Sequence, residues 1–215
     1  MKLDDDAIRA SYDRSVRIPL FWYLDTLFSR STENSIYRKK AIASLNLTGN
    51  CVVLDVACGT GLNFEIIESY LRNDGRLVGV DLSPGVLKAA ERQIIKRKWT
   101  NIELVNMSIT DYEPGILFDA ALCTFAMEIM PDYEAAVDKI FHLLKPEGKF
   151  AVIGMRLSSR MPYKLGNPFM EWFSRKFGAI DLHQDVAAYI KSKCNEVDYE
   201  ECFGGFYYIL STSKS

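Results

Sequence analysis

The chain has little from which a metal centre or a disulfide framework could be built. Its 215 residues include only two histidines and five cysteines, none of them in a Cys-x-x-Cys pair. An odd number of scattered cysteines, three of them in or beside apolar runs expected to be strands, is typical of reduced residues packed as small hydrophobes. Carboxylates do not cluster at ligand spacing either, so we expect no structural metal site. The cysteines are Cys51, Cys58, Cys123, Cys194 and Cys202.

The sequence also lacks a strong net charge and any long apolar run. With a formal net charge of −2, no global basic field indicates a nucleic-acid partner. No apolar stretch approaches the length of a membrane-spanning helix, and the acidic start of the chain, Met1 to Asp6, is the opposite of a signal peptide. We therefore expect a cytoplasmic protein that does not bind nucleic acid.

Segments with strand and helix patterns alternate along most of the chain, and their connections are short. This alternation predicts an α/β fold, a mostly parallel sheet with helices on both faces. A glycine pair, Gly204-Gly205, predicts a tight hairpin that makes the last strand antiparallel. The expected strands are 51–56, 76–81, 101–105, 118–124, 148–155, 196–203 and 206–212, and the expected helices are 4–30, 34–46, 61–72, 84–98, 132–144 and 183–192.

The most informative motif follows the first expected strand. Residues 52–64 read Val-Val-Leu-Asp-Val-Ala-Cys-Gly-Thr-Gly-Leu-Asn-Phe, and the next strand ends on Asp81. Glycines here let the backbone turn sharply into a helix and let a ligand approach closely. An acid at the tip of the second strand suits the two adjacent hydroxyls of a ribose. The pair predicts a site for an adenosine-containing cofactor.

Two residues favour S-adenosylmethionine over a dinucleotide. The third position of the dinucleotide fingerprint Gly-x-Gly-x-x-Gly/Ala is occupied by Phe64, a ring that opposes close packing of helix on strand. Asp55 lies inside the first strand, where its charge would repel a pyrophosphate but attract a sulfonium and an ammonium group. A nicotinamide-dependent oxidoreductase is the alternative that these two residues disfavour.

Three landmarks in order resemble the class I S-adenosylmethionine-dependent methyltransferases. Residues 55–61 resemble their first motif, residues 80–84 the acidic end of strand two, and Leu-Lys-Pro-Glu-Gly at 144–148 the turn before strand five. The resemblance covers about residues 50–155. Met-Pro-Asp-Tyr at 130–133 and Gly-Gly-Phe-Tyr-Tyr at 204–208 are most similar to the ubiquinone/menaquinone C-methyltransferases and phosphatidylethanolamine N-methyltransferases. The resemblance to the class I methyltransferases implies a Rossmann-like seven-stranded sheet with an antiparallel last strand.

The same resemblance implies a set of cofactor contacts. Asp55, Gly59 and Gly61 fall at the methionine end of S-adenosylmethionine, and Asp81 falls at the ribose. Ser108 stands where many relatives carry an Asp, so the adenine contact rests on its hydroxyl or on a backbone amide. The full set is Tyr12, Asp55, Ala57, Cys58, Gly59, Gly61, Asn63, Asp81, Leu82, Met107, Ser108, Ile109, Thr124 and Phe125.

Several of these residues have a purely structural alternative. Asp55 would then cap a local turn that Gly59 and Gly61 only shape. Tyr12 either closes a leading helix over the cofactor or packs that helix on the core. Asn63 either reaches the cofactor carboxylate or satisfies local backbone groups.

The sequence names no catalytic base. Methyl transfer from a sulfonium needs mainly the alignment of nucleophile, methyl group and sulfur. Glu128, His183 and Tyr12 are the weak candidates for a catalytic role. The alternatives are that Glu128 is a solvated loop residue and that His183 merely begins the helix that follows it.

Between Arg156 and Gly178 the chain shows no clear periodicity but mixes aromatic with basic residues. It holds five Lys or Arg residues against a single acid, Glu171. This composition suits weak contact with anionic lipid headgroups, and the alternative is a packed lid with a solvated basic rim.

Taken together, the sequence predicts one methyltransferase domain over 1–215. We expect an N-terminal helical cap (1–48), a cofactor-binding core (49–155), a lid (156–182) and a C-terminal helix with a hairpin (183–215). The expected acceptor is a small or lipid-like molecule, either a quinone-like ring or an amine headgroup. A non-catalytic sensor that binds the cofactor is the alternative from another class. The oligomeric state is not indicated.

Overall fold

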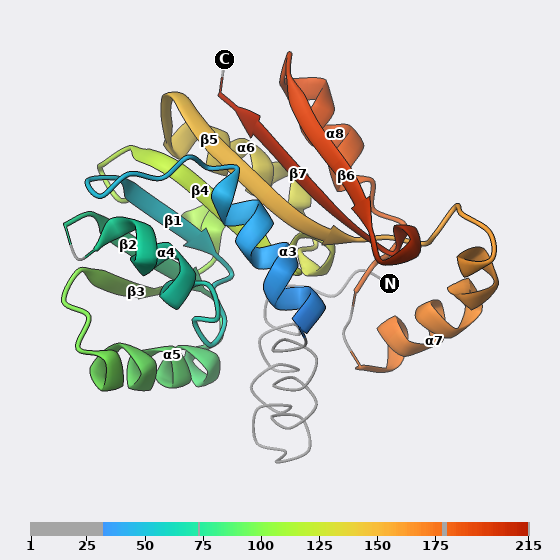
Figure 1. Cartoon of the computed structure of the whole chain (residues 1–215), viewed down its shortest axis with the longest axis horizontal. Helices are drawn as coiled ribbons and strands as arrows, with labels where there is room; N and C mark the ends of the chain where they lie inside the picture. The colour runs from blue at the N-terminus through green and yellow to red at the C-terminus, as the bar shows by residue number, and fades with distance from the viewer. Residues whose placement is uncertain (1–31, 73, 178–179, 215) are drawn as a thin grey trace.

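A computed structural model describes residues 32–72, 74–177 and 180–214 (Figure 1). The helix expected over 4–30, with Tyr12, lies outside the described residues. The α-helices are α3 (Thr32–Ala43), α4 (Phe64–Leu71), α5 (Pro84–Arg97), α6 (Tyr133–Leu143), α7 (Asn167–Phe177) and α8 (Val186–Lys193). The strands are β1 (Val52–Val56), β2 (Arg76–Asp81), β3 (Ile102–Asn106), β4 (Phe118–Thr124), β5 (Leu144–Met155), β6 (Val197–Cys202) and β7 (Tyr207–Ser213).

These strands form one sheet of seven in the order β3-β2-β1-β4-β5-β7-β6. Strands β1 to β5 pair in parallel, whereas β7 is antiparallel to both of its neighbours, β5 and β6. The predicted Rossmann-like seven-stranded sheet is confirmed. The antiparallel last strand follows from the short connection between β6 and β7, which a parallel pair would not allow.

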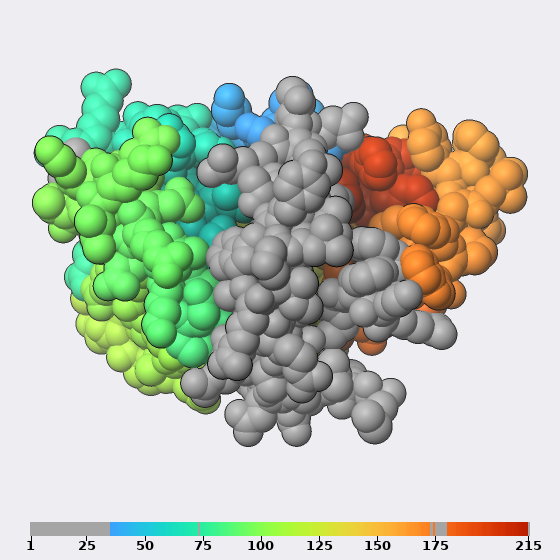
Figure 2. Space-filling view, turned by 90° about the horizontal axis from the view of Figure 1, so that it is seen from below, coloured from blue at the N-terminus to red at the C-terminus, as the bar shows by residue number. Residues whose placement is uncertain are grey.

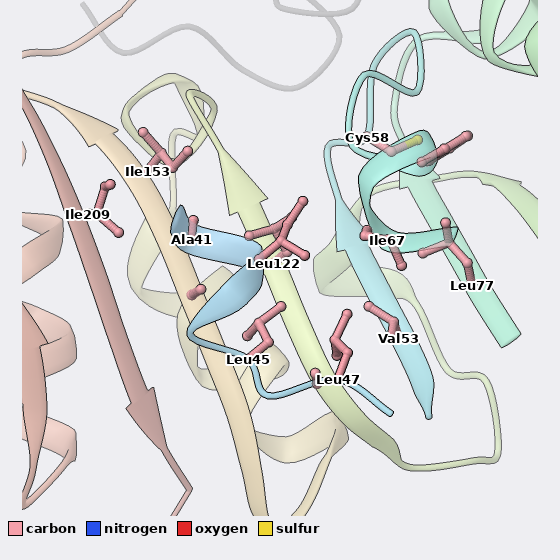
Figure 3. Packing of buried hydrophobic residues seen from close by; sticks show 14 of the residues in the cluster. Ala41, Leu45, Leu47, Val53, Cys58, Ile67, Leu77, Leu122, Ile153 and Ile209 are labelled. Carbon is pink, nitrogen blue, oxygen red and sulfur yellow. The ribbon is translucent and has the colours of Figure 1, made fainter. Parts of the chain in front are cut away.

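Apolar side chains cover both faces of the sheet and form two core clusters. Along β1, Val53 belongs to one cluster and Leu54 to the other, as expected from the alternation of side chains in a strand. Residues of α3, α4 and α5 pack in the first cluster, and residues of α6 and α8 in the second. Figure 3 shows the first cluster, where Ala41 and Leu45 lie close to Leu122 of β4. Burial on both faces explains the uninterrupted apolar strands.

The segment between β5 and α8 differs from its prediction. It contains a 3₁₀ turn, η3 (Tyr163–Gly166), followed by α7. This helix was not predicted, although Phe169, Trp172, Phe173 and Phe177 recur at helical spacing. In the structure Phe169 and Trp172 are exposed, whereas Met170 packs on the core. The connection between β6 and β7 is also a 3₁₀ turn, η4 (Phe203–Gly205), rather than a two-residue hairpin turn.

Two smaller differences concern element ends. Strand β5 begins four residues before its expected start, because Leu144 already pairs with Phe118 before the register shifts. Helix α8 begins at Val186 rather than 183, where Asp185 caps it by accepting from the amide of Ala188 at 3.0 Å. Within the described ranges, no helix combines the length and apolarity needed to cross a bilayer.

Candidate functional site

The carboxyl ends of the parallel strands bring the sequence motifs to one edge of the sheet. Val56 pairs with Val80 on one side and Cys123 on the other, so the residues that follow these three strands lie together. The turn after β1 has positive φ at Ala57 (51°), Gly59 (56°) and Gly61 (82°). In open α/β sheets this edge is where ligands bind.

Asp81 fixes the glycine turn against the end of β2. Its Oδ2 accepts a hydrogen bond from the amide of Gly59 at 2.8 Å, and its Oδ1 accepts from the amide of Ser83 at 2.9 Å. The side chain of Asn106 donates to the carbonyls of Asp81 and Leu82 at 3.0 and 2.9 Å. Because these bonds cross between loops, the acid, the glycine turn and the end of β3 are held in fixed relation.

The two glycines of the turn face different surroundings. A Cβ on Gly59 would meet no atom of the described residues within 4 Å, so among them that side of the backbone is open to a ligand. A Cβ on Gly61 would lie 2.7 Å from the ring of Phe64. The same ring comes within 3.1 Å of a Cβ placed on Gly79 in β2. Phe64 therefore fills space left by two glycines, which is how the helix begins despite the bulky residue.

Beside the turn, a buried polar network joins β1, β4 and α3. Asn63 donates from Nδ2 to both oxygens of Asp55, at 3.0 and 3.1 Å. Nη1 of Arg38 donates to Asn63 Oδ1 at 2.7 Å and to Thr124 Oγ1 at 2.5 Å. The Arg38 guanidinium also lies 5.2 Å from the centre of the Phe125 ring, within cation–π range. A positive charge is thus placed among the predicted site residues.

Arg38 is a site residue that was not predicted from the sequence. Nothing in the sequence separates it from the neighbouring basic residues Lys39 and Lys40 on α3, which are exposed. Its burial, to 8% exposure, is the distinguishing property, and it depends on how α3 lies across the sheet. Asn63 is also buried and bonds to Asp55 and Arg38, so it does more than satisfy local backbone groups.

Burial raises the pKa of Asp55 to about 7, and the hydrogen bond from Asn63 and the charge of Arg38 only partly oppose that shift. A carboxylate of this kind gains from a second positive group, because added positive charge favours its ionised form. Burial likewise raises the pKa of the Cys58 thiol well above its usual value, with the negative charges of Asp81 and Asp55 adding to the shift. Cys58 is therefore a thiol, not a reactive thiolate.

Glu128 is buried beneath the same edge, at 1% exposure, in the 3₁₀ turn η2 (Met127–Ile129) after β4. Its Oε1 accepts a hydrogen bond from the hydroxyl of Tyr208 at 2.8 Å, and Gly154 in β5 leaves the space that the pair occupies. Among the residues that the structure describes, none donates to its Oε2. The expectation of a solvated loop residue is wrong, because the turn directs the side chain onto β5. Burial raises the pKa of Glu128 to about 7.

The remaining predicted residues are less closely joined. His183 has an exposed side chain whose Nε2 lies 3.7 Å from Oε1 of Glu171. Ser108 shares a hydrogen bond of 2.9 Å with Thr110, and Met107 is 37% exposed, whereas Ile109 is buried in the core cluster that includes α6. In the described part of the chain, no group of His, Cys, Asp or Glu residues could hold a metal ion.

The two raised carboxyl pKa values predict how stability depends on pH. Between about pH 4.5 and 7 the folded protein holds protons that the unfolded chain has released, so the free energy of unfolding falls as pH rises through that range. At about 1.4 kcal/mol per pKa unit, Glu128 alone accounts for about 3 kcal/mol. Urea unfolding at pH 5 and pH 8 should show a smaller difference for Glu128→Gln than for the parent.

Glu113→Gln is the matched control for this measurement. Glu113 is exposed and its pKa is lowered by the hydrogen bond from Lys139, so its removal should leave the dependence above pH 5 unchanged. A Glu128→Gln variant with the full pH dependence of the parent would contradict the assignment of that dependence to Glu128.

The model of a methyltransferase domain family matches residues 53–148. The chain is 25% identical over 185 residues to a demethylmenaquinone methyltransferase of Lactiplantibacillus plantarum, covering 83% of this chain and 73% of that one. It is 28% identical over 124 residues to the enzyme of that name from Lactococcus lactis, covering 56% and 48%. The chain thus spans from about half to three quarters of the length of these relatives.

Solved structures agree on the fold. An N-methyltransferase, NodS, from Bradyrhizobium japonicum in complex with S-adenosylhomocysteine has a TM-score of 0.72 at 15% identity, over 96% of this chain and 98% of that one. Phosphoethanolamine N-methyltransferase 2 of Haemonchus contortus with S-adenosylmethionine has a TM-score of 0.76 at 15% identity, over 96% and 60%. At these identities the likeness concerns the fold.

Proposed function

We propose that this chain, a class I S-adenosylmethionine-dependent methyltransferase, transfers the methyl group to a lipid-like acceptor with a quinone-like ring or an amine headgroup. The observation that carries the proposal is the glycine turn. Its open side at Gly59 lies next to the carboxylate of Asp81, which holds the amide of Gly59 at 2.8 Å. A ligand that enters there meets an open stretch of backbone and an acid at the same point.

The residues around the turn fit S-adenosylmethionine, which supplies a methyl group already activated by a sulfonium. We assign Asp81 to the ribose hydroxyls. Asp55, whose pKa burial raises to about 7, would be favoured in its ionised form by the cofactor's ammonium and sulfonium groups at this edge. Arg38, on the other side of Asn63, is the group we assign to the cofactor's carboxylate. The acidic Asp55 and the basic Arg38 thus lie on opposite sides of Asn63. This arrangement suits the methionine portion of the cofactor, which carries an ammonium group and a carboxylate.

The other proposed cofactor contacts are the residues that the sequence motifs indicate, with one residue added and one contributing differently. Arg38 is added, and Ile109 contributes through its backbone, because its side chain is buried in the core. The adenine would lie near Leu82, Met107 and Ser108. Thr124 and Phe125, joined to Arg38 by a hydrogen bond and a ring contact, would line the methionine portion.

Two kinds of acceptor are supported by different relatives. The curated relatives are named as demethylmenaquinone methyltransferases, which supports a quinone-like ring. Two structural neighbours are named as N-methyltransferases, which supports an amine headgroup. The reaction requires little of the protein beyond alignment of the reacting groups. If a proton must be removed from the acceptor, the buried pair of Glu128 and Tyr208 is the candidate that we assign to hold it. Sequence similarity favours the quinone-like ring.

A transfer assay tests this proposal. The protein is incubated with methyl-labelled S-adenosylmethionine and extracts containing quinones and amine lipids, and the products are separated by mass spectrometry. We expect label in one class of lipid-like product and an equal amount of S-adenosylhomocysteine. Asp81→Ala serves as the weakened control, and it should transfer less label than the parent at a cofactor concentration that does not saturate the variant. Label in proteins or RNA only would contradict the proposed acceptor class.

A further inference from the structure

Large apolar side chains gather on the solvent side of η3 and α7. In most of the described chain such residues are buried, yet five between Met161 and Trp172 are between 51% and 74% exposed, and Phe203 of η4 is 48% exposed. We call these six the η3–α7 apolar face: Met161, Tyr163, Leu165, Phe169, Trp172 and Phe203. Contiguous exposed apolar surfaces of this kind mark sites where a protein meets a partner or a membrane.

Contacts within the fold hold parts of this face in place. The ring of Tyr163 lies against Gly204, which has no side chain to keep it away and is next to Phe203. Phe169 and Trp172 stand one helical turn apart with ring centres 5.9 Å from each other. On the opposite side of α7, Met170 packs on the core and Ser174 is buried. The helix therefore buries one side and presents its aromatic side outward.

Hydrogen bonds fix the base of this projection. The amide of Ser158 donates to Asn167 Oδ1 at 3.0 Å, and Ser158 Oγ donates to the carbonyl of Gly204 at 2.6 Å. The Asn167 amide returns a bond of 3.0 Å to the carbonyl of Ser158. These contacts tie the start of α7 to the turn between β6 and β7, so the apolar face has a defined position.

That position is beside the candidate site. Met155, at the end of β5, pairs with Tyr207, and Tyr207 pairs with Cys202, so η4 lies at the same edge of the sheet as Thr124. In Figure 1, α7 extends beyond this edge at the right of the molecule, and Figure 2 shows residues of the segment in orange at that end. If another surface were bound to this face, an acceptor leaving that surface would be close to the edge of the sheet where the cofactor is proposed to bind.

We propose that the η3–α7 apolar face docks on an anionic lipid membrane, from which the enzyme takes its acceptor. Tyrosine and tryptophan are suited to the headgroup region, because each has an apolar ring and a polar atom. Residues 156–177 supply five Lys or Arg residues and one acid, in a chain of net charge −2. The choice of acceptor rests on the proposed function; the docking itself does not.

The structure limits the electrostatic part of this interaction. Nε of Arg160 lies 2.7 Å from Oε2 of Glu201, and Nη1 of Arg156 donates to Oε1 of the same residue at 3.5 Å and to the Tyr199 hydroxyl at 2.9 Å. Glu201 on β6 therefore offsets part of the positive charge. Because apolar burial is not screened by salt, we expect attachment that weakens at high salt without disappearing.

Vesicle sedimentation tests the docking. The parent protein, the triple variant Leu165→Ser/Phe169→Ser/Trp172→Ser and the control Ile95→Ser are mixed with phosphatidylcholine vesicles with and without phosphatidylglycerol, at low and high salt. Ile95 is 69% exposed on α5, so the Ile95→Ser substitution removes an exposed apolar side chain that lies outside the face. We expect the parent and the control to sediment with anionic vesicles. The affinity of the triple variant for these vesicles should fall by at least about tenfold, which corresponds to about 1.4 kcal/mol.

Two further measurements separate the other outcomes. Sedimentation velocity without lipid tests for a second copy: a parent dimer that the triple variant dissociates would overturn membrane docking in favour of self-association. Parent protein that stays in the supernatant with every vesicle would also overturn it. S-adenosylhomocysteine binding should be equal in all three proteins, so failure of docking is distinguishable from failure of the cofactor site.

Discussion

Asp81→Ala is expected to weaken the binding of S-adenosylhomocysteine by about ten- to a hundredfold, or roughly 1.5–3 kcal/mol. The carboxylate is assigned to the ribose hydroxyls, and it also holds the amides of Gly59 and Ser83. Its removal therefore takes away a charge-assisted contact with the ligand and loosens the turn that the ligand meets. Isothermal titration calorimetry measures the loss.

The control for this variant is Glu103→Ala. Glu103 is a partly exposed acid on β3 that pairs with Arg76, and exposed pairs of this kind contribute little to stability. Its removal should leave the affinity unchanged. Equal affinity of Asp81→Ala and the parent would show that the acid at the end of β2 does not contact the cofactor.

Gly59→Ala and Gly61→Ala should fail in different ways. Both glycines have positive φ, so alanine costs roughly 1–2 kcal/mol of backbone strain at either position. At Gly59 the new methyl group enters open space assigned to the cofactor, and we expect a folded protein that binds S-adenosylhomocysteine more than about tenfold more weakly. At Gly61 it meets the buried ring of Phe64 at 2.7 Å, which should cost a few kcal/mol more by overpacking.

Gly115→Ala is the matched control for both. Gly115 has φ of 66° and, like Gly59, has no atom of the described part of the chain within 4 Å of an added Cβ. It precedes β4, at the end of the strand away from Thr124. Circular dichroism melting should show a similar loss of stability for Gly59→Ala and Gly115→Ala, with affinity lost only in the former. Unchanged affinity in Gly59→Ala would contradict the placement of the cofactor against this turn.

Much of the parallel sheet could be predicted because its information is local. The apolar run before Asp55, the glycine turn and the acid of Asp81 are each short patterns, and the sheet places them together without further information. The antiparallel β7 also followed from its short connection to β6 and from the resemblance, whereas the order of the strands comes from the structure alone. Glycine roles were less predictable, since only the packing of Phe64 distinguishes Gly61 from Gly59.

The less predictable parts depend on contacts between distant segments. Arg38 lies 25 residues before Asn63 and 86 before Thr124, and no spacing rule connects them. The burial of Glu128 requires Tyr208, which is 80 residues away, and the space left by Gly154. Helix α7 could have been predicted from the helical spacing of Phe169, Trp172 and Phe173, but the sequence does not show that Phe169 and Trp172 are exposed. A count of charged residues within 156–178 likewise could not predict that Arg160 pairs with Glu201 on β6.

Calorimetric titration of the parent protein with S-adenosylhomocysteine, and separately with NAD, tests the central claim most directly. The geometry of Gly59, Asp81 and the Asp55–Asn63–Arg38 network predicts saturable binding of S-adenosylhomocysteine with one site per chain, and no heat of binding with NAD. Binding of NAD with no binding of S-adenosylhomocysteine would contradict the assignment of the site to S-adenosylmethionine and would indicate a dinucleotide-dependent enzyme instead.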